Sequence, residues 1–218
     1  MIRTSSHKNW NSKLYTTYAI SGNRGLDANY HGNCFKELAP KITFWKVWHE
    51  NIGIISEEEN NRYYIEQYYL QVLSKLDPED IYQKLDNSVL LCYEETDQFC
   101  HRHIVAEWFQ LLLDIHVPEI KMNENNIEEL ERPTYIKIYL EEAIKKNKNM
   151  KDFKSLRALY LFEKAEKFEL KANQLYQETG QFDNQYRYNA NQLKREAEEI
   201  EKYAKRNVKT LNRQMIIN

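Results

Sequence analysis

The sequence contains few of the residues that interrupt regular structure. Of its 218 residues, only five are glycine and four are proline. Such scarcity favours long helices over turn-rich sheets. At the same time 42% of the residues are hydrophobic and 13% are aromatic. That content is enough to bury a core, which excludes an intrinsically disordered chain and predicts one or two globular domains.

Cysteine is also scarce. Cys34, Cys92 and Cys100 are the three cysteines, and this odd number does not predict a disulfide framework. The N-terminal stretch MIRTSSHKNWNSKLY lacks an apolar core of signal-peptide length. No window approaches the roughly 20 apolar residues of a membrane span. These absences predict a protein of the reducing cytoplasm that has no membrane partner.

Charge is distributed unevenly along the chain. Residues 1–144 carry 14 Lys and Arg against 23 Asp and Glu, whereas residues 145–218 carry 17 against 10. Within the first of these segments, residues 123–132 form a polar, acidic stretch that ends at Pro133. We therefore predict an α/β domain over 1–122, a linker over 123–134 and a basic helical extension over 135–218.

The order of the predicted elements is typical of an α/β fold. Strands are predicted at Ile2–Ser5, Leu14–Ser21, Ser88–Tyr93 and His116–Ile120. Helices are predicted at Thr43–Asn51, from Ser56 to about Leu76, from Asp77 to about Leu85, and from Ile104 to Leu113. Trp45 and Trp48 on the first of these helices are expected to face inward. Alternation of strands and helices predicts a mainly parallel sheet with at least one right-handed crossover.

The basic extension predicts a helical hairpin. After a helix over Tyr135–Lys145, long helices are predicted at Lys151–Thr179 and from Asn184 to about Arg213, with Gly180 between them. Apolar residues on the last helix recur at spacings of three and four: Tyr186, Ala190, Leu193, Ala197, Ile200, Ala204 and Leu211. Because such a seam is heptad-like and the connection is short, we expect an antiparallel, coiled-coil-like pair.

The stretch SVLLCYEETDQFCHRHIVAEWFQLLL, residues 88–113, is the strongest indication of a functional site. It predicts a buried strand, a short polar loop and a helix. In an open α/β sheet, ligands bind beyond the carboxyl ends of the strands, where backbone N–H groups at the start of a helix are exposed. Chemically reactive side chains are concentrated at this corner: Cys92, Glu94, Cys100, His101, Arg102 and His103.

Four stretches carry a resemblance to a known family: AIS (Ala19–Ser21), LAP (Leu38–Pro40), YLQVLSKLDPEDIY (Tyr69–Tyr82) and LLCYEETDQFCHRHIVAEW (Leu90–Trp108). Through them, residues 18–120 resemble the uncharacterised bacterial family called domain of unknown function 488. The resemblance implies a small, Rossmann-like, three-layer domain. The family's recurring polar residues map onto Cys92, Glu94, Cys100, His101 and Arg102, whereas the tail from Asn123 lies outside the resemblance.

Three kinds of site fit the corner. Arg102, with Ser21 and Lys36, would hold an anionic and nucleotide-like substrate, although Arg102 could instead pair with Glu94 or Glu107 and only fix the loop. Cys100 would act as a nucleophile, with His101 and Glu94 as proton donors and acceptors; the alternative is that Cys100 is an unreactive side chain that fills space in the core. Transition-metal ligands are the weakest expectation; the candidates are Cys92, Cys100, His101 and His103, with His31 and Cys34 on the preceding loop.

The basic extension suggests a second class of function. Its cations cluster in two groups: Lys145, Lys146, Lys148, Lys151 and Lys154, then Lys194, Arg195, Lys202, Lys205, Arg206 and Lys209. Such a surface could bind nucleic acid, with Tyr186, Tyr188 and Tyr203 stacking on bases. It could equally be a solvated face with glutamate partners, or the hairpin could join two copies of the chain.

Overall fold

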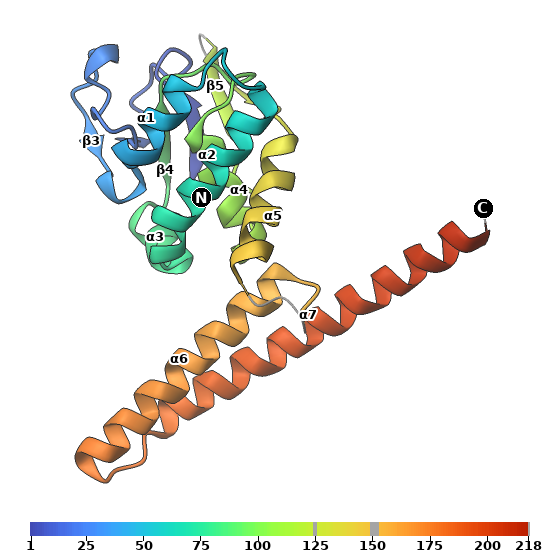
Figure 1. Cartoon of the computed structure of the whole chain (residues 1–218). Helices are drawn as coiled ribbons and strands as arrows, with labels where there is room; N and C mark the ends of the chain where they lie inside the picture. The colour runs from blue at the N-terminus through green and yellow to red at the C-terminus, as the bar shows by residue number, and fades with distance from the viewer. Residues whose placement is uncertain (124–125, 149–152, 218) are drawn as a thin grey trace. The chain divides into compact units, whose positions relative to one another are not determined.

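The computed structural model describes residues 1–123, 126–148 and 153–217, with side chains described as far as residue 207. The chain divides into two compact units, Met1–Lys148 and Asn149–Asn218. Figure 1 shows the α/β unit in blue to yellow and the helical unit in orange to red. Over the described residues, every helix is too short or too polar to cross a bilayer.

A six-stranded sheet organises the first unit. Its strands are β1 (Arg3–Ser6), β2 (Thr16–Ala19), β3 (Asn33–Cys34), β4 (Ser88–Cys92), β5 (Glu119–Asn123) and β6 (Asn126–Leu130), in the spatial order β3-β2-β4-β1-β5-β6. Every pairing is parallel except that of β5 with β6. Strands β4 and β1 are central, and all five residues of β4 are buried. The carboxyl ends of β2 and β4 therefore meet at one edge of the sheet.

Five α-helices accompany the sheet in this unit: α1 (Ile42–Glu50), α2 (Glu57–Gln71), α3 (Pro78–Lys84), α4 (His101–Leu113) and α5 (Tyr135–Asn147). Short 3₁₀ turns occupy Leu26–Ala28, Lys36–Leu38 and Leu73–Lys75. The first residues of α2 and α3 are fixed by capping residues that the sequence reveals. At the start of α2, Ser56 Oγ accepts a hydrogen bond of 3.2 Å from the backbone N–H of Glu59. At the start of α3, Asp77 is the N-cap and Pro78 lies in the first turn.

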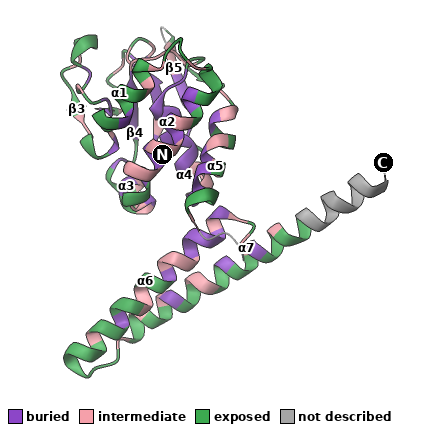
Figure 2. Cartoon of the chain, viewed as in Figure 1, coloured by how far each residue is buried: buried purple, intermediate pink, exposed green. Residues whose placement is uncertain are grey.

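The two faces of β4 are covered differently. Successive strand residues point to opposite faces, so Val89 and Leu91 share one face and Cys92 lies on the other. Val89 and Leu91 pack with Trp10 and Ile120 in one buried cluster. Cys92 faces α4, whose first nine residues are all buried. Figure 2 shows this burial in purple along β4 and α4.

The segment predicted as a linker contains a strand. Residues 123–134 include β6, which pairs antiparallel with β5 from Asn123↔Asn126 to Glu119↔Leu130. β6 is an edge strand with an exposed or half-buried sequence, NIEEL, so it lacks the apolar alternation that marks a strand in sequence. The following helix, α5, packs against α2 and α4 within the first unit. The division between units therefore lies after Lys148 rather than at 123–134.

The second unit is a helical hairpin of α6 (Leu156–Thr179) and α7 (Asn184–Ile217). Gly180 ends α6 with a φ of 69°, a left-handed conformation that glycine adopts without a Cβ penalty. The described seam residues of α7 are buried or half-buried, with Ala190 and Ala197 fully buried, and Tyr186 stacks on Phe168 at 5.9 Å. Lys151 and the side chains of Lys209 and Leu211 lie outside the described residues.

The α/β class, the mainly parallel sheet and the C-terminal helical pair are thus confirmed. On α1 the prediction fails in detail. Its N-cap is Lys41, Phe44 is the buried aromatic residue, and Trp45 is 38% exposed. Trp48 is half-buried and packs against Tyr64 and Phe99, so the inward face runs through Phe44 and Trp48, and Trp45 alone departs from the predicted face.

Candidate functional site

A cavity of about 560 Å³ opens at the carboxyl ends of β2 and β4. Its reactive wall is formed by Cys92, Glu94, Cys100 and His101. Aromatic side chains make up much of the remaining lining: Trp45, Trp48, Tyr64, Tyr93 and Phe99. Ser21, Gly22, Asn23, Asp27, Pro40 and Ile42 complete it. The cavity therefore combines a polar, chemically reactive side with flat apolar walls.

Chain geometry brings the two thiols together. Cys92 is the last residue of β4, and Cys100 is the N-cap of α4, with the loop 93–99 between them. No side chain caps the start of α4. The thiol of Cys100 therefore lies at a helix N-terminus, where the unpaired amides favour negative charge.

His101 is fixed by the neighbouring strand. Its Nε2 lies 3.1 Å from the carbonyl oxygen of Ile20, just beyond the end of β2. Its Nδ1 lies 3.6 Å from Cys92 Sγ. Its Nε2 also lies 3.8 Å from the same sulfur, so Cys92 is nearly equidistant from the two ring nitrogens, and Nε2 is the one that also contacts the backbone.

The charges of this wall depend on each other. Burial opposes ionisation of Cys100, but a hydrogen bond with Cys92 and the positive charge of Arg102 outweigh it, so the pKa of the Cys100 thiol falls well below its usual value. Burial and the neighbouring Cys100 raise the pKa of Cys92. Burial, again with Cys100, raises the pKa of Glu94 to about 7. The two thiols thus differ in character, and Cys100 is the one that ionises.

His101 acquires a complementary charge. Burial lowers the pKa of its imidazole, but the hydrogen bond and the negative charge of Cys100 dominate, and the net shift is upward. Glu94 accepts a hydrogen bond from Cys92 Sγ at 3.3 Å. The pKa shifts therefore favour a thiolate at Cys100 and a protonated imidazole at His101, beside a Glu94 carboxyl group with a pKa of about 7.

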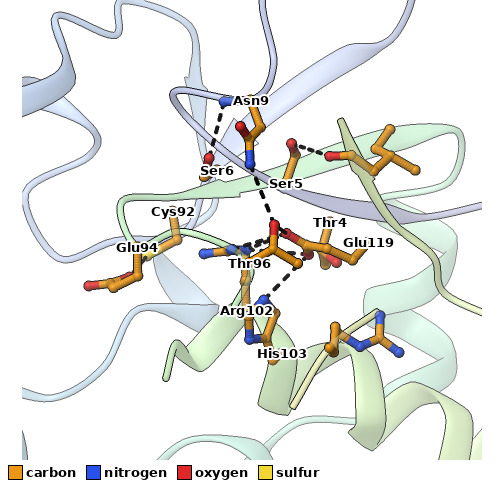
Figure 3. Close-up of polar contacts among 12 residues, drawn as sticks. Thr4, Ser5, Ser6, Asn9, Cys92, Glu94, Thr96, Arg102, His103 and Glu119 are labelled. Atoms are coloured by element: carbon orange, nitrogen blue, oxygen red, sulfur yellow. Dashed lines mark hydrogen bonds and ion pairs between the residues drawn. The ribbon is translucent and has the colours of Figure 1, made fainter. Parts of the chain in front are cut away.

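Arg102 does not reach the cavity, contrary to the predicted anion-binding role. Its guanidinium is fully buried and donates from Nη2 and Nε to Glu119 Oε1, at 3.0 and 3.1 Å. His103 Nε2 approaches the same carboxylate at 3.6 Å. Figure 3 shows Arg102 and His103 directed at Glu119, with Cys92 and Glu94 lying apart from that pair. Arg102 is therefore part of the core, and Glu119 takes the place of the expected partners Glu94 and Glu107.

Ser21 and Lys36, the other two residues predicted to bind the anion, do not form an anion site with Arg102 either. Ser21 lines the cavity, but its hydroxyl donates to Asn23 at 3.2 Å and accepts the Gly25 amide at 3.0 Å, so it holds the loop turn. Gly25 needs its positive φ of 81°, and a Cβ there would lie 2.8 Å from Tyr30. Lys36 is exposed on a 3₁₀ turn outside the cavity lining.

The metal-ligand candidates also divide. Ligand atoms of Cys92, Cys100 and His101 all lie within 4.8 Å of one another, which is the one such group found among the described residues. His103 belongs to the Glu119 cluster instead, and His31 and Cys34 are not part of the group. Of the two predicted histidine ligands, His101 therefore joins the two thiols and His103 does not.

Comparison with known families identifies the domain. A family model described as DUF488-N3a, active DUF488-N3 subclade, matches residues 3–112. The chain belongs to the DUF488 family. No curated protein and no solved structure matches it. The DUF488 match confirms the predicted resemblance but begins earlier, so that it includes β1. It contains the whole cavity lining, whereas Glu119 and the helical unit lie beyond it.

Sequence reasoning missed two parts of this site. The aromatic lining comes from α1, α2 and the loop before α4, and no local pattern links Trp45, Tyr64 and Phe99. Glu119 stands after Pro118 in a stretch with no other sign of function. Its burial as a charged residue at the start of a strand becomes informative only when the partner is known.

Proposed function

We propose that the DUF488 domain is an enzyme that binds a small molecule in the cavity and acts on it through the Cys100 thiolate. The observation that carries the proposal is the convergence of a thiol, an imidazole and a carboxyl group on one wall of a cavity of about 560 Å³. This combination of residue types is the one that nucleophilic catalysis by cysteine requires.

Each residue has a distinct role in this proposal. Cys100 attacks an electrophilic carbon of the substrate and forms a covalent thio-intermediate. His101 stabilises the thiolate before attack. As the bond from that carbon to the leaving group breaks, the protonated Glu94 donates its proton to the leaving group, and the Glu94 carboxylate then takes a proton from the water that hydrolyses the thio-intermediate. Cys92 connects Glu94 and His101, at 3.3 and 3.6 Å from its sulfur.

The lining supports a planar substrate with an anionic group, such as a nucleotide. Trp45, Trp48 and Tyr64 offer flat faces on which a ring can stack. The amides at the start of α4 favour an anion, whereas the buried Arg102 contributes its charge only from beneath the wall.

The absence of a disulfide among the three cysteines supports a cytoplasmic location.

Selective alkylation tests the nucleophile. In a Cys34→Ser background, with metal removed by a chelator, iodoacetamide should modify Cys100 rapidly and Cys92 slowly, as read by peptide mass spectrometry. His101→Gln should slow the reaction, because the thiolate loses its counter-charge. The matched control is His103→Gln, on the same helix turn but facing Glu119. Equal rates for Cys100 and Cys92, or no effect of His101→Gln, would refute the role.

The helical unit supports a second candidate function, binding of nucleic acid or of another copy of the chain. Tyr188 and Tyr203 are 59% and 68% exposed, and Arg195 and Lys202 are exposed on the same helix. Other cations of the hairpin have acidic partners, as in the Lys194–Glu169 pair at 2.7 Å. Retention of the full chain on heparin should fall in an Arg195→Glu, Lys202→Glu variant if phosphate is bound. Light scattering of the same two proteins tests self-association.

A further inference from the structure

The reactive wall has the composition of a soft-metal site. It offers two sulfur atoms and one imidazole nitrogen, from residues that are 1%, 2% and 6% exposed. In a tetrahedral zinc site, Zn–S bonds of about 2.3 Å and Zn–N bonds of about 2.0 Å place neighbouring ligand atoms roughly 3.5 Å apart. The observed Cys92 Sγ to His101 Nδ1 separation is 3.6 Å. We infer that Cys92, Cys100 and His101 form a binding site for one Zn²⁺ ion.

The orientation of His101 supports the assignment. Metal-ligating histidines generally donate their second ring N–H to a carbonyl or carboxylate, which fixes the ring and its tautomer. Here Nε2 lies 3.1 Å from the carbonyl oxygen of Ile20, which leaves Nδ1 as the nitrogen available to a metal ion. Nδ1 and Nε2 lie 3.6 and 3.8 Å from Cys92 Sγ. The ring is thus held in place by the protein before any ion arrives.

The type of ligand selects the ion, and the cavity completes the site. Thiolate and imidazole ligands suit zinc and exclude Mg²⁺ and Ca²⁺, which require oxygen ligands. Three protein ligands leave one position of a tetrahedral site, and all three residues line the cavity. That position is therefore available to water or to a small molecule, with the Glu94 carboxylate on the same wall.

Metal binding would regulate the proposed enzyme. Bonding to zinc withdraws electron density from the Cys100 sulfur and lowers its nucleophilicity, so an ion at this site would slow the proposed attack on a substrate. Only this consequence rests on the proposed function; the site itself stands on its ligand geometry. The chemistry of the domain would then depend on whether the cavity holds a metal ion or an organic molecule.

Cobalt titration of the full chain tests the site. Under reducing conditions after chelation, Co²⁺ should produce a thiolate-to-cobalt charge-transfer band and intense tetrahedral d–d bands with one equivalent, and Zn²⁺ should abolish both. Cys92→Ser, Cys100→Ser and His101→Gln should each weaken binding by more than the roughly 10–100-fold that outer-shell changes cost. Cys34→Ser and His103→Gln should bind like the wild type.

A second measurement covers variants that fail to fold. In the wild-type chain, one equivalent of Zn²⁺ should protect both Cys92 and Cys100 from iodoacetamide and leave Cys34 reactive. Absence of the charge-transfer band in the wild type, or unchanged affinity in a folded Cys100→Ser variant, would overturn the metal site. The nucleophile is tested separately by alkylation of metal-free protein, so either idea can fail while the other survives.

Discussion

Glu119→Gln should destabilise the DUF488 domain more than any surface substitution. The carboxylate of Glu119 and the guanidinium of Arg102 are both fully buried, and Glu119 Oε1 accepts bonds of 3.0 and 3.1 Å. Removing the negative charge leaves a buried, uncompensated cation. Breaking a buried pair from one side costs about 3–5 kcal/mol. We expect a loss in that range at pH 7.

The same pair sets a pH dependence. Burial opposes ionisation of Glu119, but His103 and Arg102 outweigh it and lower the pKa of the carboxyl group from 4.5 to about 2. A depressed pKa stabilises the fold above the unfolded value and ceases to do so as pH falls through the folded value. At about 1.4 kcal/mol per pKa unit, roughly 3 kcal/mol should be lost between about pH 4.5 and pH 2. Glu119→Gln should lack this component.

Urea unfolding followed by tryptophan fluorescence is the assay. All four tryptophans, Trp10, Trp45, Trp48 and Trp108, lie in the first unit, so the signal is specific to it. Glu142→Gln is the control; Glu142 pairs with Arg62 at the surface, where such pairs contribute about 0–1 kcal/mol. A double variant, Arg102→Met with Glu119→Gln, should recover much of the loss. If Glu119→Gln and Glu142→Gln unfold at the same urea concentration, the argument from burial is wrong.

Three smaller predictions concern local structure. Ser56→Ala should cost about 1 kcal/mol in the urea assay, because the Glu59 amide loses its cap. Gly180→Ala, at a φ of 69° with no neighbouring atom within 4 Å, should cost about 1 kcal/mol through backbone strain alone, seen as a lower melting temperature of the helical circular dichroism signal. Ala190→Leu, at a fully buried position of the hairpin, should cost about 1–3 kcal/mol by overpacking in the same measurement, whereas Asn191→Leu, at an exposed position, should not.

Much of the fold could be predicted because its central elements carry their burial in the sequence. β4 is an unbroken apolar run, and α2 and α3 begin at recognisable caps at Ser56 and Asp77. β6 could not be predicted, because an edge strand of sequence NIEEL has neither an apolar run nor alternation. β6 is a strand because it pairs with β5, and that pairing depends on tertiary structure rather than on the local sequence.

The site was predictable up to the direction of individual side chains. The reactive residues had to converge, since eight positions of chain separate a strand end from a helix start. Consecutive residues of a helix nevertheless point about 100° apart, so His101 faces the cavity while Arg102 faces Glu119. The sequence does not reveal which neighbour turns inward, because the deciding partner lies 17 residues further along the chain.

The buried guanidinium of Arg102 influences the electrostatics of the cavity, although it is not part of the cavity wall. Its positive charge contributes to lowering the pKa of the Cys100 thiol, although no atom of Arg102 lines the cavity. A ligand entering from solvent would therefore meet a thiol whose pKa is lowered in part by a positive charge that the ligand cannot contact. Anyone redesigning this domain from its surface potential would overlook the residue that tunes its sulfur.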